Sequence, residues 1–459
     1  AQVIRHTAVS AAGPPPGVCA MPHRANRSAA AILILSILLA GCADTSEDAE
    51  GASPPRAAVE AYEEGMDLLN RRLGRTDTEA AVAAFERAVE ADPEYTAAWS
   101  GLARARAWLQ WNLGVADQLP LAEAAAARAD ELDPDAVETH LALGYVDYWG
   151  HADLDGALRH FQAAERLAPD DAEVAGAIGN IHRRQGRLEE AIAAYERRIE
   201  IDPDHAQGLA TLAGTYDAVG RHGDSWALAD RLSELGDPRA PVRRFWASFH
   251  AGDTARAWQE IPQIQEAQGR AGEPGYFAFL QAYARDDRAA ADALIEEIGT
   301  EGTGAQLGAL MSIHLGLSGQ SDEHAETFDG WITGIEEGLV ENPATDRARL
   351  AQANRHGNLA LLEALRGNRD AALAHVEHVR DLDPASLDAW AAGPRVNVAL
   401  TLAVLDEKED GLAALEELAD QGAISTGWLA FEPSFDGLRE DPRFEAIVAE
   451  RAAIDQPVM

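Results

Sequence analysis

The chain is poor in two residue types that carry much of protein chemistry. Among its 459 residues, Lys408 is the only lysine, and Cys19 and Cys42 are the only cysteines. No phosphate-binding loop of the G-x-x-x-x-G-K-[ST] type can be assembled around that single lysine. Because both cysteines lie within the first 42 residues, the rest of the chain can form neither a disulfide framework nor a thiolate metal site.

Aromatic residues are also scarce, at 6% of the chain, whereas alanine-rich segments recur and β-branched runs are few. This composition favours helices throughout. The formal net charge is −39, and so acidic a chain repels phosphate backbones, which argues against nucleic-acid binding. Two interpretations of the charge stay open: a solvated acidic surface, or a surface that steers basic partners.

Motifs for catalysis are missing from the sequence. There is no G-x-S-x-G elbow, no H-E-x-x-H helix and no cysteine nucleophile after residue 42. His375 and His378 could share a metal ion, but no third ligand stands near them, so we expect these histidines to face solvent. We predict no enzymatic activity, no metal site, no cofactor and no small-molecule substrate. A hidden enzyme would need a pocket with convergent polar groups between Ala240 and Asn342.

Proline-anchored turns divide the first half of the chain at nearly constant intervals. Their spacings are 41, 35, 34 and 35 residues. A period near 34 residues is typical of stacked helical hairpins, none of which can bury its apolar face alone. The turns are Asp92-Pro93, Asp133-Pro134, Ala168-Pro169, Asp202-Pro203 and Asp237-Pro238.

The unit that ends at Pro203 shows the expected hairpin most clearly. Gly186 separates a first helix from a second, on which Ala191 and Tyr195 recur one turn apart. Gly179 and Ala191 are small enough for the two helices to approach closely. Tyr195 is predicted to fill the gap beside them.

These residues resemble the tetratricopeptide repeat, whose pattern of alanine, aromatic residue, alanine and proline returns in the units that end at Pro93 and Pro169. The resemblance implies an all-α fold, a tetratricopeptide-type α-solenoid in which antiparallel helix hairpins form a right-handed superhelix. It also implies a scaffold that holds protein partners.

The repeats are similar to those attached to bacterial winged-helix regulators and class III adenylate cyclases. The segment 431–444 resembles the closing piece of such regions, which we expect to cover the open end of the solenoid. Asp441 can cap a helix there, with Pro442 at its first position and Phe444, Ile447 and Val448 on its apolar face. No winged helix or cyclase domain precedes these repeats, so only the scaffold is expected to carry over.

The N-terminal region resembles a bacterial lipoprotein signal. Arg24 and Arg27 precede the apolar stretch 29–40, which ends in the lipobox-like sequence LAGC with Cys42 last. This stretch is too short to span a bilayer, which takes about 20 residues. The resemblance implies lipid modification of Cys42. Because Ala43 follows instead of aspartate, it also implies an outer-membrane lipoprotein of a Gram-negative bacterium, facing the periplasm.

These patterns divide the chain into segments of different character. The expected segments are 1–20, an upstream extension; 21–41, a lipoprotein signal peptide; 42–57, a disordered acidic tether; 58–239, the repeat array; 240–345, degenerate hairpins; 346–425, C-terminal repeats; and 426–459, a C-terminal cap.

The concave surface of tetratricopeptide proteins is lined by the first helix of each hairpin, and aromatic and arginine side chains are common binding hot spots. Arg183 and Arg184 form a basic spot there that could take a peptide carboxylate. Alternatively, the tyrosines pack between hairpins and the arginines pair with neighbouring acids. The predicted groove residues are Arg104, Trp108, Trp111, Tyr145, Tyr148, Asn180, Arg183 and Arg184.

The one irregular interval, 41 residues between Pro93 and Pro134, implies an insertion around Trp108 and Trp111. These side chains either pack into the core or form an exposed binding ridge.

Together these features favour a non-enzymatic, lipid-anchored scaffold that binds a protein or peptide at the periplasmic face of the membrane. The alternative is a regulatory subunit that modulates an envelope enzyme or sensor, which would differ because its binding changes a rate.

Overall fold

The computed structural model describes residues 53–71, 75–113, 115, 117–268, 274–285, 287–298, 305–343, 346–383 and 392–455. These residues form helices and no β-strand, which confirms the predicted all-α fold. None of the described helices is long and apolar enough to cross a membrane. Cys42, the proposed signal segment and most of the proposed tether lie outside the described residues.

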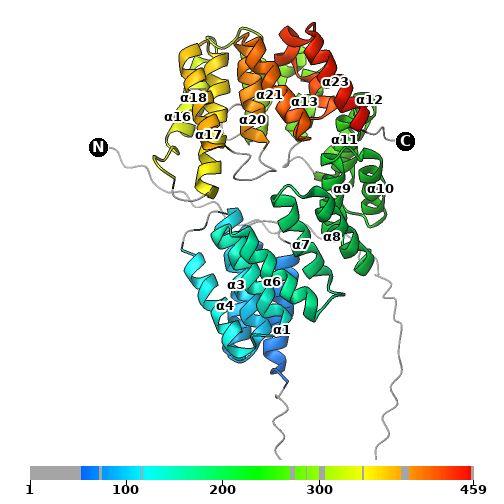
Figure 1. Ribbon diagram of the computed structural model, residues 1–459, viewed down its shortest axis with the longest axis vertical. Helices are drawn as coiled ribbons and strands as arrows, with labels where there is room; N and C mark the ends of the chain where they lie inside the picture. The colour runs from blue at the N-terminus through cyan, green and yellow to red at the C-terminus, as the bar shows by residue number, and fades with distance from the viewer. Residues whose placement is uncertain are drawn as a thin grey trace, which may run out of the picture. The chain divides into compact units, whose positions relative to one another are not determined.

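The first half of the described chain consists of helices paired in sequence order (Figure 1). The pairs are α1 (Arg56–Arg71) with α2 (Arg75–Ala91), α3 (Thr96–Leu113) with α4 (Leu119–Leu132), α5 (Val137–Tyr145) with α6 (Leu154–Leu167), α7 (Ala172–Arg184) with α8 (Leu188–Ile201), α9 (Ala206–Ala218) with α10 (His222–Glu234) and α11 (Ala240–His250) with α12 (Thr254–Gln268). Helix α5 continues into a π-helical segment, η1 (Val146–His151).

Helices also pair in the second half, which ends in a compact C-terminal segment. The pairs are α13 (Pro274–Ala284) with α14 (Arg288–Ile298), α17 (Asp346–Leu365) with α18 (Arg369–Leu382) and α20 (Gly393–Val404) with α21 (Lys408–Asp420). Helices α15 (Ala305–Leu317) and α16 (Ala325–Glu336) pack on α17, and the chain ends with α22 (Thr426–Phe431), the 3-10 helix η2 (Pro433–Leu438) and α23 (Pro442–Ile454).

Each proline-anchored turn separates one helix pair from the next. Helix α8, for example, ends at Ile201, directly before Asp202-Pro203, because proline has no N–H for helix continuation. Side-chain caps begin two of the following helices, α7 and α9. At the start of α7 the Asp171 carboxylate accepts hydrogen bonds from the N–H groups of Glu173 at 2.7 Å and Val174 at 3.0 Å.

The contact between a glycine and an aromatic ring holds the two helices of a hairpin together. Tyr195 is fully buried, and a Cβ atom placed on Gly179 would lie 2.6 Å from its Cε1 atom. The predicted close approach of these two helices is therefore confirmed. Phe161 packs on Gly144 in the same way.

Buried side chains of α11–α17 and α20–α23 form one core, from Phe245 to Ile447. Helix α18 contributes Val376 and Val379 to a smaller, separate cluster with α17 and α20. At its C-terminal side Asp441 caps α23, accepting a hydrogen bond from the Arg443 N–H at 2.9 Å, with Pro442 in the first turn. This cap was predicted from the sequence and is confirmed.

The C-terminal segment, expected to cover the open end of the solenoid, packs on the last hairpin through η2 and α23. It also contacts α11, where Trp428 of α22 meets Phe249 with ring centroids 5.2 Å apart. Gly427 leaves no room for a Cβ atom beside the Phe249 carbonyl. The segment thus joins the last hairpin to a helix near the middle of the chain.

The glycine contact predicts a stability difference between two glycine positions. Gly179→Val should lower the free energy of unfolding by about 1–3 kcal/mol, because its side chain would overlap the Tyr195 ring. Gly330→Val is the control, since nothing lies within 4 Å of a Cβ atom there. Urea unfolding followed by circular dichroism measures both. Equal midpoints for the two variants would show that the contact is not required.

Candidate functional site

The predicted groove residues lie on the first helices of three successive hairpins. Arg104, Trp108 and Trp111 belong to α3, Tyr145 ends α5 and Tyr148 lies in η1. Helix α3 packs against both α5 and η1, so these five side chains form one region. The remaining three, Asn180, Arg183 and Arg184, lie on α7.

Aromatic rings fill the space between α3 and η1. Trp108 packs edge-on against Trp149 with centroids 5.0 Å apart, and Trp111 lies 5.9 Å from Tyr148. Trp149 also stacks on Tyr145 at 4.2 Å. The two tryptophans of the insertion are half-buried, so they take part in packing and still reach the surface.

Arg104 is part of the interior. Its side chain is buried, forms an ion pair with Glu173 on α7, and lies 5.1 Å from the centre of the Tyr145 ring. Arg104, Tyr145 and Tyr148 are each only 4% exposed. These three residues therefore lie below the surface of this region. A partner could not reach them without a rearrangement of the helices.

Arg184 is held against the aromatic cluster. Its Nε atom donates a hydrogen bond to the Tyr148 hydroxyl at 3.1 Å, and its guanidinium lies 5.9 Å from the centre of the Trp111 ring. A cation in this position gains from the ring quadrupole. On the same helix, the Asn180 side-chain oxygen accepts a hydrogen bond from the Tyr195 hydroxyl at 2.8 Å.

We call the partly exposed residues of this region the α3–α7 face. Its members are Trp108, Trp111, Asn180, Arg183 and Arg184. The face combines two large rings with two guanidinium groups in a strongly acidic protein. Their role in binding stays a prediction, since the structure shows their positions without a partner.

His375 and His378 on α18, which the sequence left without a third ligand, meet His356 of α17. The Nδ1 atoms of His356 and His375 are 3.0 Å apart, and the ring centroids of His356 and His378 are 4.6 Å apart. Burial, together with His378 and His375, lowers the pKa of His356 from its usual 6.5 to about 4. Only the packing of α17 on α18 could reveal this cluster, because 19 residues separate His356 from His375.

Polar groups also gather in the segment 240–345, where an enzyme would need its pocket. Asp287, Arg288, His314 and Ser318 line one small hollow. The Nε2 atom of His314 lies 2.9 Å from an oxygen of Asp292. Among the described residues, no side-chain hydrogen bond joins Ser318 to His314, so the hollow lacks the contact of an activated nucleophile with its base.

A family model of the tetratricopeptide repeat matches residues 146–206, from η1 to the start of α9. Together with the glycine and aromatic contacts between paired helices, this match defines an all-α fold of the tetratricopeptide type. Comparison with curated proteins gives no match.

Several solved structures are similar to part of the chain. PilW, a type IV pilus biogenesis factor, is 18% identical over 48% of this chain and 98% of its own, with a TM-score of 0.38. A tetratricopeptide protein of Thermus thermophilus is 22% identical over 42% and 98%, with a TM-score of 0.35. One from Parabacteroides merdae is 15% identical over 57% and 100%, with a TM-score of 0.39.

The lowered pKa of His356 predicts a loss of stability in acid. The unfolded chain takes up a proton near pH 6.5 and the folded chain only near pH 4, so His356 favours the folded state above pH 6.5. That contribution is lost as the pH falls from 6.5 to about 4. His356→Asn should therefore flatten the decline of the melting temperature across this range. A His356→Asn protein with the wild-type decline would contradict the assignment.

Proposed function

We propose that this protein is a non-enzymatic scaffold that binds a protein or peptide on the α3–α7 face. The single observation that carries the proposal is the arrangement of Arg184, which is positioned by Tyr148 beside the half-buried Trp111. Tryptophan and arginine are among the residues enriched at binding hot spots. The tetratricopeptide match over 146–206 supports a scaffold role.

The chemistry of the face favours a particular kind of peptide. Arg183 and Arg184 are adjacent on α7 and carry positive charge on a chain whose formal net charge is −39. A carboxylate can form charge-assisted hydrogen bonds with such guanidinium groups. Trp108 and Trp111 offer apolar area beside them. We therefore infer a ligand segment that carries a carboxylate next to an apolar side chain.

We further propose that Cys42 is lipid-modified and anchors the scaffold to the outer membrane, facing the periplasm. The support is the sequence alone: a basic stretch, a twelve-residue apolar stretch and LAGC stand in the order of a lipoprotein signal. The acidic segment that follows would hold the helical array away from the lipid surface.

Charge reversal on the face tests the binding proposal. Arg183→Glu combined with Arg184→Glu should remove partners captured by the detergent-solubilised protein. With a purified partner, affinity should fall about tenfold or more, because two charge-assisted contacts are lost. The matched control, Arg231→Glu with Arg380→Glu, makes the same charge change at exposed arginines of α10 and α18. An unchanged partner set, or equal losses in both double variants, would refute the assignment.

Replacement of the cysteine tests the anchor. Cys42→Ser should prevent incorporation of labelled palmitate and release the protein from the membrane fraction, and globomycin should block processing of the wild-type chain. Cys19→Ser is the matched control and should change neither result. A Cys42→Ser protein that remained in the membrane fraction would rule out this lipid anchor without affecting the binding proposal.

A further inference from the structure

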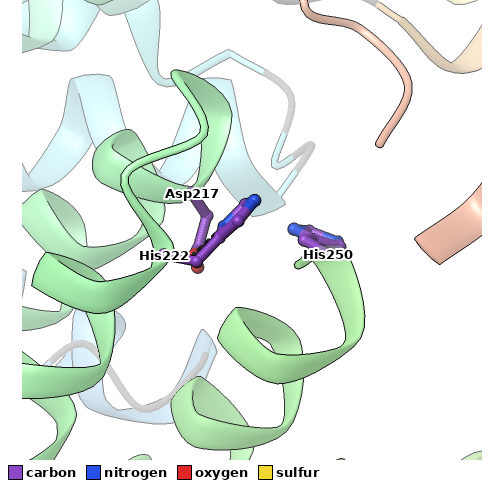
Figure 2. Close-up of side chains that lie close together, drawn as sticks. All are labelled: Asp217, His222 and His250. Carbon is purple, nitrogen blue, oxygen red and sulfur yellow. Dashed lines mark hydrogen bonds and ion pairs between the residues drawn. The ribbon is translucent and has the colours of Figure 1, made fainter. Parts of the chain in front are cut away.

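A compact group of potential metal ligands lies away from the α3–α7 face. Asp217 is near the end of α9, His222 begins α10 and His250 ends α11. Each can offer one ligand atom, and these atoms all lie within 4.8 Å of one another. Figure 2 shows the His250 ring directed toward His222 from the opposite side of the group. Within the described ranges, this is the one group of three or more such residues that meets this distance.

The turn between α9 and α10 brings the first two ligands together. Gly220 adopts a φ of +78°, which lets the chain reverse directly after α9, and the Arg221 N–H donates to the Tyr216 carbonyl at 2.8 Å. Asp217 and His222 consequently lie on the two sides of one tight turn. Helix α11 packs against both α9 and α10 and supplies His250.

The spacing of two of the three ligand atoms suits a tetrahedral metal ion. An oxygen of Asp217 lies 3.2 Å from Nδ1 of His222. With metal–ligand bonds of about 2.0–2.2 Å, two ligands in tetrahedral zinc geometry stand about 3.3 Å apart. A metal ion could therefore replace the proton between these two atoms.

The other ring nitrogen of His222 faces a second carboxylate. Its Nε2 atom is buried, has no hydrogen-bond partner of good geometry, and lies 3.4 Å from an oxygen of Asp455. Asp455 is itself held by the Thr426 N–H at 2.8 Å and by Arg451 at 2.7 Å. Histidines that bind metals commonly direct their other N–H to such a carboxylate, which fixes the ring and strengthens the ligand.

Charges near the group both favour and oppose a bound cation. The Asp217 carboxylate attracts a cation to the group. Arg243 of α11 lies near enough for its charge to act on Asp217 and His250, and it would oppose a bound cation. Without a metal, a protonated His222 could bridge Asp217 and Asp455 instead.

We propose that Asp217, His222 and His250 bind one divalent transition-metal ion, with Asp455 orienting His222. Two imidazoles and one carboxylate are ligands typical of zinc, and water would complete the tetrahedron. The ion would link the α9–α10 turn to the end of α11. Asp455, which directly follows α23, would lie beside it. This site does not depend on the proposed function.

Titration of the full-length, detergent-solubilised protein with Zn²⁺ tests the site after removal of metals by a chelator. We expect one tightly bound ion per chain, and with Co²⁺ the intense visible absorption of tetrahedral coordination. His250→Phe, which keeps the ring volume, and Asp217→Asn should each weaken binding about 100-fold or more, since even outer partners of metal ligands contribute 10–100-fold.

Two further variants distinguish this site from the histidine cluster of α17 and α18 and from a purely structural cluster. His375→Ala removes a histidine of the α17–α18 cluster and should leave tight binding unchanged. Arg243→Gln removes the opposing charge and should strengthen binding several-fold, a result that a merely structural role of these residues would not produce. Circular dichroism confirms that each variant is folded.

Three outcomes would overturn the proposal. The first is the absence of stoichiometric Zn²⁺ binding by the wild-type chain, which would leave His222 as a protonated bridge. The second is tight binding that survives in both His250→Phe and Asp217→Asn. The third is loss of binding in His375→Ala, which would place the ion between α17 and α18.

Discussion

The contact between an aromatic ring and a glycine is the constraint on which the helical array depends. Phe85 of α2 packs on Gly65 of α1 and also on Gly101 of α3, so one ring sets the spacing of three helices. Phe161 and Tyr195 each make this contact with one glycine of their own hairpin, Gly144 and Gly179. Because glycine has no Cβ atom, the backbone can approach the ring closely enough to exclude water. Each hairpin thereby presents a surface for the next.

This regular stacking aligns the first helices of successive hairpins. The irregular interval between Pro93 and Pro134 shapes the α3–α7 face. The extra residues of α3 carry Trp108 and Trp111, and the π-helical η1 carries Tyr148 and Trp149 opposite them. The aromatic side chains of the longer helix α3 and of η1 thus pack against one another. A ring cluster that stabilises the array also reaches the surface, where Arg184 lies beside it.

Contacts with distant parts of the chain hold the C-terminal segment in place. Trp428 meets Phe249, and Asp455 lies against His222 although more than two hundred positions separate them in the sequence. Buried charged groups of this kind are costly unless they are paired and hydrogen-bonded. Asp455 meets that requirement with Thr426 and Arg451. The C-terminal segment is therefore held by directed polar contacts as well as by its apolar face.

The sequence by itself determined the features that depend on neighbouring residues. The helix pairs, the turn at Asp202-Pro203, the close approach at Gly179 and the cap at Asp441 all follow from local spacing and backbone chemistry. The sequence also selected the eight predicted groove residues, because the repeat places α3, α5 and α7 in equivalent positions. It could not distinguish buried members from exposed ones.

Only the tertiary structure decided which of these residues a partner could reach and which titratable groups meet. Arg104 is buried and forms an ion pair with Glu173, which lies two helix pairs along the array. His356 lies beside His375, and His250 lies beside Asp217 and His222, because their helices pack together. The spacing of residues along the sequence does not indicate these contacts. The physical reason is that helical periodicity specifies which face of a helix is apolar, whereas the partner across that face depends on how the whole chain packs.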